Sequence, residues 1–148
     1  VTTLVVGDHG MADVQHVVDP RPLVARLAGV RVFVDSTLLR LWGPEGAIAE
    51  ARRVLHGALP ELTFLDREAL AREQLPVAGS PYGDAIGVLP EGQLFSPSFV
   101  GGKVRGMHGY HPSGSSADAA LLADFPIPAQ VRSISDVASL VDAQLGLS

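Results

Sequence analysis

The chain begins with a short apolar run that ends in a carboxylate and an imidazole. Residues 4–6 are Leu-Val-Val and predict a buried strand, which the Gly-Asp-His-Gly-Met sequence of residues 7–11 cannot continue. Asp8 and His9 are therefore expected at the carboxyl end of a strand, where open α/β sheets hold their ligands. Both side chains are ordinary ligands of zinc-like ions, and Gly10 permits a sharp turn. For an isolated Asp-His pair, a strand followed by a polar turn is the simpler interpretation.

A second glycine-bracketed histidine changes that interpretation. Residues 106–112 read Gly-Met-His-Gly-Tyr-His-Pro, about a hundred residues after the first motif. Together the two segments resemble the metal-binding motifs of the type I phosphodiesterase/nucleotide pyrophosphatase family, within the alkaline phosphatase superfamily. The resemblance implies that Asp8 and His9 bind one divalent ion, most simply zinc, and that His108 binds a second ion beside it.

The resemblance also implies a fold. We expect an α/β chain that forms part of an alkaline-phosphatase-like three-layer α/β/α sheet with a small inserted α+β subdomain. Residues 1–18 and 77–148 are assigned to the C-terminal part of the metal-binding core, and residues 19–76 to the cap-like insertion.

The local patterns predict the elements of the insertion and of the segment after it. Within the insertion, Asp19 and Pro20 begin a short helix that closes at Gly29. Alternating and apolar residues predict two paired strands, and spacings of three and four predict an amphipathic helix. The expected ranges are strands over 30–35, 37–42, 62–65, 85–89 and 117–125, helices over 45–59, 66–74 and 133–146, and a long loop over 90–105.

The resemblance places the remaining machinery upstream. Family members carry a Thr or Ser nucleophile, a metal-bound Asp and an Asp-x-x-x-His pair in an upstream half, and no residue here corresponds to them. We therefore interpret the chain, which enters a strand soon after Val1, as the C-terminal portion of a longer protein. Alone it is expected to be inactive, with the N-terminal half as its partner. The resemblance implies a metal-dependent hydrolase of phosphodiester or pyrophosphate bonds, with a small phosphodiester or nucleotide as its substrate. Two cations about 4 Å apart would stabilise both the attacking and the leaving oxygen of such a reaction.

Several other residues near the motifs have open roles. His111 stands where many relatives have Asp; it could orient His108, contact substrate or cap the loop. Tyr110 and His111 are the candidate substrate-binding residues. For Lys103 and Arg105, solvated surface charge is a simpler interpretation than contact with a substrate anion. Further candidates are assigned structural roles: His56 at a helix end, and Trp42 as packing at a strand end rather than as a stacking platform.

Composition narrows the function classes. A formal net charge of -5 and the lack of a basic run argue against binding to a nucleic-acid polymer. Bound metal ions could still supply a local positive field for phosphate chemistry. The chain has no cysteine, no apolar window long enough for a membrane segment and no signal-peptide pattern, so the compartment is left open.

Two alternatives accompany the phosphodiesterase hypothesis. A sibling enzyme of the superfamily, such as a phosphomonoesterase, a phosphonate hydrolase or a sulfatase, would share the strand-end Asp-His pair. Met11 and Tyr110 favour the phosphodiesterase branch. A non-catalytic metal-binding or interaction module is the second alternative.

Overall fold

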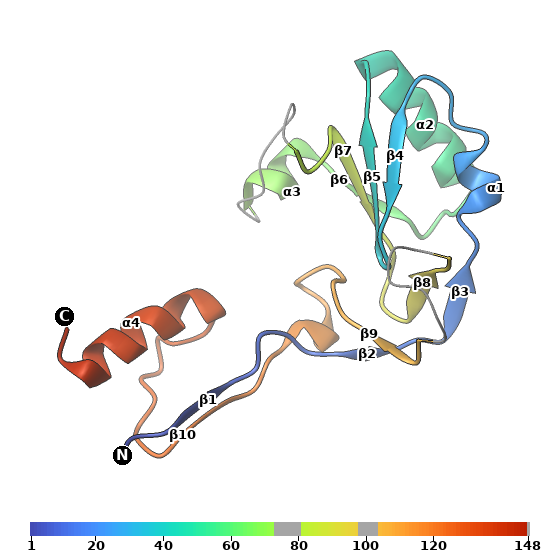
Figure 1. Cartoon of the computed structure of the whole chain (residues 1–148). Coiled ribbons are helices and arrows are strands. Elements are labelled where there is room, and N and C mark those ends of the chain that lie inside the picture. The colour runs from blue at the N-terminus through green and yellow to red at the C-terminus, as the bar shows by residue number, and fades with distance from the viewer. Residues whose placement is uncertain (73–80, 98–103, 148) are drawn as a thin grey trace. The chain divides into compact units, whose positions relative to one another are not determined.

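The computed structural model describes residues 1–72, 81–97 and 104–147, and its chain separates into two compact units. Unit 1 consists of residues 1–10 and 118–148, and unit 2 consists of residues 11–117. Each unit is described by itself below. Figure 1 gives the elements of both.

Unit 2 is built around a four-stranded antiparallel sheet with the strand order β4-β5-β7-β6. Its strands are β4 (Arg31–Val34), β5 (Leu38–Trp42), β6 (Thr63–Leu65) and β7 (Ala85–Val88). The turn at Asp35 joins β4 to β5, where its carboxylate accepts a hydrogen bond from the Ser36 amide. Because side chains alternate along a strand, each sheet face receives a distinct set of residues.

One face of this sheet packs against α2 (Glu45–Ala58) (Figure 1). Ile48, Ala51 and Leu55 recur at intervals of three and four and lie in the same apolar cluster as Leu39 and Leu41. The short helix α1 (Arg21–Val24) precedes the sheet, and Leu23 packs against this cluster. This is the largest of the three apolar cores of the described chain.

The opposite face is covered in part by α3 (Arg67–Arg72). Leu70 of α3 packs with Ile86 and Val88 of β7 in a second apolar cluster. The Asp66 carboxylate accepts a hydrogen bond from the Ala69 amide at 2.7 Å and so caps this helix, as expected from the sequence.

Two short strand pairs complete unit 2. β2 (Ala12–Asp13) pairs antiparallel with β9 (Gly106–Met107), and β3 (His16–Val18) pairs parallel with β8 (Gln93–Phe95). A 3-10 turn over Ser115–Ala117 ends the unit. These strands were not expected from the sequence, because pairs of two or three residues are too short to leave an alternating pattern.

Unit 1 contains a two-stranded antiparallel ribbon and one helix. The ribbon joins β1 (Leu4–Val6) to β10 (Leu121–Ala123), and the helix α4 spans Ile134–Leu145. The prediction that residues 4–6 form a buried strand is only half right, because the side chains of Val5 and Val6 are 55% and 40% exposed. β10 is the single strand that pairs with β1 within the described residues, and a two-stranded ribbon cannot cover both of its own faces.

The order of elements in the insertion is confirmed, with corrected ends. α1 ends at Val24, well before Gly29, although Gly29 does adopt the expected left-handed conformation with φ +73°. The strand expected over 117–125 is reduced to Leu121–Ala123. The expected end of the third helix at 73–74 lies outside the described residues. The assignment of residues 1–18, 19–76 and 77–148 to core and cap stays a prediction.

Candidate functional site

The first motif lies in unit 1, directly after β1. The Gly7 amide donates to the Ala120 carbonyl at 2.8 Å, which extends the ribbon by one bond before the chain turns at Asp8. A Cβ atom at Gly7 would lie 3.2 Å from the Ala120 nitrogen, so glycine permits this close approach. The ribbon therefore ends where the two polar side chains of the motif begin.

His9 is held in one orientation by its own backbone. Its Nδ1 atom lies 2.9 Å from the Gly10 carbonyl oxygen, which can only accept, so the proton of the neutral ring lies on Nδ1. The lone pair of Nε2 then points away from the backbone, on the side where Asp8 Oδ2 lies at 3.6 Å. Histidine ligands of metals commonly donate their other ring N–H to a carbonyl in this way.

The Asp8-His9 pair fits a shared metal ion. Two ligands of one tetrahedral zinc, at bond lengths of about 2.1 Å, are roughly 3.4 Å apart, close to the 3.6 Å between Asp8 Oδ2 and His9 Nε2. The Asp8 side chain is 84% exposed, so it is open to an incoming ion. No set of three or more His, Asp or Glu side chains that could hold an ion occurs in the described parts of the chain. By themselves, Asp8 and His9 could therefore supply only two of the ligands of such an ion.

The second motif lies in unit 2, where a buried hydroxyl fixes its backbone. His108 is exposed and follows β9, and Gly109 adopts φ +86°, a left-handed conformation that favours glycine. The Thr37 hydroxyl donates to the Gly109 carbonyl at 2.7 Å. A Cβ atom at Gly109 would lie 3.2 Å from that hydroxyl oxygen, so the site requires glycine for space as well as for conformation.

Tyr110 anchors the chain directly after Gly109. Its ring is buried in a third apolar cluster with Leu94 and Met107, and its hydroxyl donates to the Gln93 carbonyl at 2.9 Å. Burial raises the pKa of the Tyr110 hydroxyl, so this donor keeps its proton. These contacts give Tyr110 a structural role in the loop, and the substrate contact expected from the sequence stays a prediction.

His111 closes the loop on itself. The Ser113 amide donates to His111 Nδ1 at 3.2 Å, and the Ser113 hydroxyl lies 2.7 Å from the same nitrogen. Of the three roles that the sequence left open, this geometry supports capping of the loop. Its substrate-binding role is a prediction still.

Glu91 ties the following turn to the rest of unit 2. Its carboxylate accepts hydrogen bonds from the Ser116 amide at 3.0 Å and the Ser116 hydroxyl at 2.7 Å, and a further one from Ser115. The bonds from Ser116 hold the pKa of Glu91 below its usual range. Thr37 supports the second motif and Glu91 supports the turn that follows it, and sequence reasoning missed both because neither stands in a motif.

A strand pair connects the chain segments that adjoin the two motifs. In the β2-β9 ladder, Ala12 pairs with Met107 and Asp13 pairs with Gly106. Met11, the last residue of the first motif, packs over Gly106, where a Cβ atom would come within 3.2 Å of the Met11 side chain. The segment that leaves the first motif is therefore hydrogen-bonded to the segment that enters the second.

Other sequence candidates lie away from these contacts or outside the described residues. Lys103 lies outside them. Arg105 is exposed and its carbonyl accepts from the Val14 amide, which agrees with a surface charge. His56 is exposed in the last turn of α2.

Comparison with known proteins identifies the fold. No protein-family model matches the chain, and no curated protein matches it in sequence. Among solved structures, human ectonucleotide pyrophosphatase/phosphodiesterase 5 superposes with a TM-score of 0.77 at 19% identity over 99% of this chain. The chain therefore has the fold of one portion of that structure. The resemblance inferred from the two motifs is thereby confirmed at the level of fold.

Two further structures support the same conclusion. The murine ectonucleotide pyrophosphatase/phosphodiesterase 5 gives a TM-score of 0.76 at 21% identity. Phosphonoacetate hydrolase from Sinorhizobium meliloti, in complex with phosphonoacetate, gives 0.62 at 18% identity over 90% of this chain. The chain spans 41% of the length of the first protein and 38% of the second. Within the described residues, no helix has the length and apolar character needed to cross a membrane.

Proposed function

We propose that this chain supplies part of the two-metal site of a hydrolase that cleaves phosphodiester or pyrophosphate bonds in small substrates such as nucleotides. In this proposal Asp8 and His9 bind one divalent ion, most simply zinc, and His108 binds the second. The nucleophile and the remaining ligands come from a part of the protein that this chain does not include. In this proposal the β1-β10 ribbon of unit 1 belongs to the larger sheet of a three-layer α/β/α fold.

The β2-β9 ladder carries this proposal. The two motifs are about a hundred residues apart in sequence, with the whole proposed insertion between them, yet the segments that adjoin them are paired residue by residue. The ladder brings together, within unit 2, the segments that adjoin the two motifs. The match to structures of the same superfamily over 99% of the chain is a second, independent support.

The residues of this chain act by holding ligand atoms in place. The Gly10 carbonyl fixes the tautomer of His9, so that Nε2 presents its lone pair, while Asp8 adds the negative charge that retains a cation. Thr37 and Tyr110 hold the backbone that follows His108. When bound, two such ions would supply Lewis-acid stabilisation of the charged oxygens of a phosphoryl transfer. The murine relative has been captured in complex with AMP, which favours a nucleotide as the substrate class.

The proposal is tested by measuring hydrolysis of a diester, bis-p-nitrophenyl phosphate, and of a monoester, p-nitrophenyl phosphate. Both are assayed with the whole protein that contains this chain and with the 148-residue chain. We expect diester hydrolysis by the whole protein alone, its loss on chelation and its recovery with zinc. No chelator-sensitive cleavage of the diester by the whole protein would contradict the proposal.

A phosphonate hydrolase is the second candidate, because the fold also matches phosphonoacetate hydrolase. Phosphonoacetate should be included as a substrate in the same assays, with release of inorganic phosphate as the readout. Faster turnover of phosphonoacetate than of the diester would select this candidate. The lower TM-score and coverage of that match place it second.

A further inference from the structure

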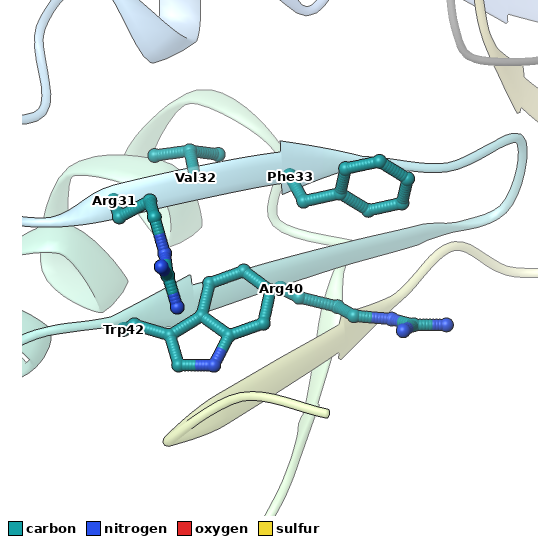
Figure 2. Close-up of a pocket in the computed structure, with 5 residues that line it drawn as sticks. All are labelled: Arg31, Val32, Phe33, Arg40 and Trp42. Atoms are coloured by element: carbon teal, nitrogen blue, oxygen red, sulfur yellow. The ribbon is translucent and has the colours of Figure 1, made fainter. Parts of the chain in front are cut away.

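The face of the four-stranded sheet next to the part covered by α3 carries two arginines among aromatic rings. Arg31 lies directly across from Trp42 in the β4-β5 register, and Phe33 lies across from Arg40. Opposite residues of an antiparallel pair share a face, so all four side chains project to the same side (Figure 2). With Val32 they line a hollow of about 320 Å³.

Each guanidinium of this face contacts aromatic rings. The Arg31 guanidinium lies 4.5 Å from the centre of the Trp42 ring, and that of Arg40 lies 5.8 Å from Phe33 and 5.9 Å from Tyr82. Asp35 reaches Arg40 only at 3.9 Å, and no carboxylate forms an ion pair with Arg31 among the described residues. The two guanidinium groups are therefore only weakly paired with carboxylates within the described residues.

The Arg40 Nε–H group lacks an acceptor within the described part of the chain. Among the buried side-chain polar atoms of the described residues, Arg40 Nε is the one without a hydrogen-bond partner. Buried N–H groups in proteins almost always have an acceptor, and an orphaned one points to a group that the chain itself does not supply. A guanidinium favours a planar, two-oxygen anion as that acceptor.

We propose that this arginine-aromatic face, formed by Arg31, Phe33, Arg40 and Trp42, binds a small aromatic anion, namely an aromatic ring bearing a carboxylate or phosphate. The anionic group bonds to the guanidinium groups, and the ring packs against Phe33 and Trp42. The hollow is of the size that small-molecule sites occupy, at the lower end of their range. The Trp42 side chain, expected from the sequence to be mere packing, is here part of a binding surface.

The single tryptophan of the chain makes the proposal directly measurable. The 148-residue chain, kept in excess chelator so that metal-dependent binding is excluded, is titrated with AMP, adenosine and inorganic phosphate while Trp42 fluorescence is recorded. We expect saturable quenching by AMP, at least about tenfold weaker binding of adenosine, and no saturable change with phosphate alone. Equal binding of AMP and adenosine, or no saturable quenching up to millimolar AMP, would overturn the proposal.

Substitutions localise the site and distinguish possible ligands. Arg40→Gln and Arg31→Gln should each weaken AMP binding by roughly tenfold or more, because a charge-assisted hydrogen bond is lost. Arg53→Gln is the matched control, since Arg53 is an exposed arginine of α2 that pairs with Glu50. Circular dichroism confirms that each variant is folded, and wild-type affinity in both Arg31 and Arg40 variants would exclude the site.

A second titration uses isophthalate, because it is an aromatic anion that contains no nucleoside. Binding of both isophthalate and AMP supports a general site for aromatic anions, and binding of AMP alone supports a nucleotide site. The proposal does not depend on the hydrolase function, because none of the four residues belongs to the metal motifs.

Discussion

The two motifs lie in units that differ sharply in packing. His108 belongs to unit 2, whose three apolar clusters surround the sheet and the loop. Asp8 and His9 belong to unit 1, in which Leu140 is the single fully buried hydrophobic residue among those described. The ribbon of unit 1 leaves Val5 and Leu122 more than half exposed. The packed core of unit 2 therefore supports the His108 motif, whereas the Asp8-His9 motif of unit 1 lies on a ribbon with little apolar packing.

This contrast separates the roles of chemistry and packing. The proposed function takes metal ligands from both units, so it predicts equal effects for substitutions at Asp8, His9 and His108. Substitutions in the scaffold should have unequal effects, because only unit 2 has a core to disrupt.

The largest expected effect is on catalysis by the whole protein. Asp8→Ala, His9→Ala and His108→Ala should each lower kcat/KM by at least about a hundredfold, because the loss of even a supporting partner of a metal ligand costs 10–100-fold. Steady-state kinetics on bis-p-nitrophenyl phosphate, with zinc content measured in parallel, tests this. His56→Ala is the matched control, an exposed histidine outside both motifs, and should retain activity. Near-normal turnover in any of the three variants would remove that residue from the site.

Packing of the scaffold gives the next largest effect. Leu41 is completely buried in the main cluster of unit 2, so Leu41→Ala should lower the free energy of unfolding by about 2–5 kcal/mol. Leu122 is 64% exposed in unit 1, and Leu122→Ala should change the free energy of unfolding by no more than about 0.5 kcal/mol. Urea unfolding followed by far-UV circular dichroism measures both. Equal losses in the two variants would show that the ribbon is as well packed as the sheet.

Removing the hydrogen bond from Thr37 to the His108 loop should have a smaller effect on stability than removing Leu41 from the core. Thr37→Val keeps the shape of the side chain but removes the hydrogen bond to the Gly109 carbonyl, which should destabilise the chain by about 1 kcal/mol. In the whole protein we expect weaker zinc binding, by up to roughly tenfold, if this bond positions His108.

Thr37→Ser is the control for that prediction, because it restores the hydroxyl. Zinc affinity is measured by competition with a chromophoric chelator. A Thr37→Val protein that loses stability and binds zinc normally would limit Thr37 to a structural role.

The sequence predicted local elements well and supporting contacts poorly. The apolar spacing of α2 and the alternation of β4 and β5 are local signals, and the structure confirms these three elements. The β2-β9 ladder and the bond from Thr37 to Gly109 join residues about 70 or more positions apart, and neither leaves a trace in the nearby sequence. The arginine-aromatic face was missed for a related reason, since the opposition of Arg31 and Trp42 depends on the register between two strands.

The smallest effect concerns the start of α4 in unit 1. The Asp136 carboxylate accepts hydrogen bonds from the Arg132 amide and from the Ser133 amide, each at 2.9 Å, and from the Ser133 hydroxyl. The bond from the Arg132 amide has the largest effect, and together these bonds hold the pKa of Asp136 below its ordinary value of 3.8. A carboxylate whose pKa is lowered by folding stabilises the folded state above its unfolded pKa and loses that contribution as the pH falls through its folded pKa.

The first turn of α4 should therefore be ordered at pH 5 and above and fray below pH 3.8, with no comparable change near neutral pH. Asp136→Asn should remove this acid dependence, because the amide cannot titrate. Amide exchange of residues 134–137, measured by NMR between pH 2.5 and 6 and corrected for intrinsic rates, compares the two proteins. Since Leu140 is the one buried anchor of this helix among the described residues, fraying at its start should remain local and leave the sheet of unit 2 unchanged. Acid-induced loosening of β5 in step with α4 would instead indicate that the two units unfold as one.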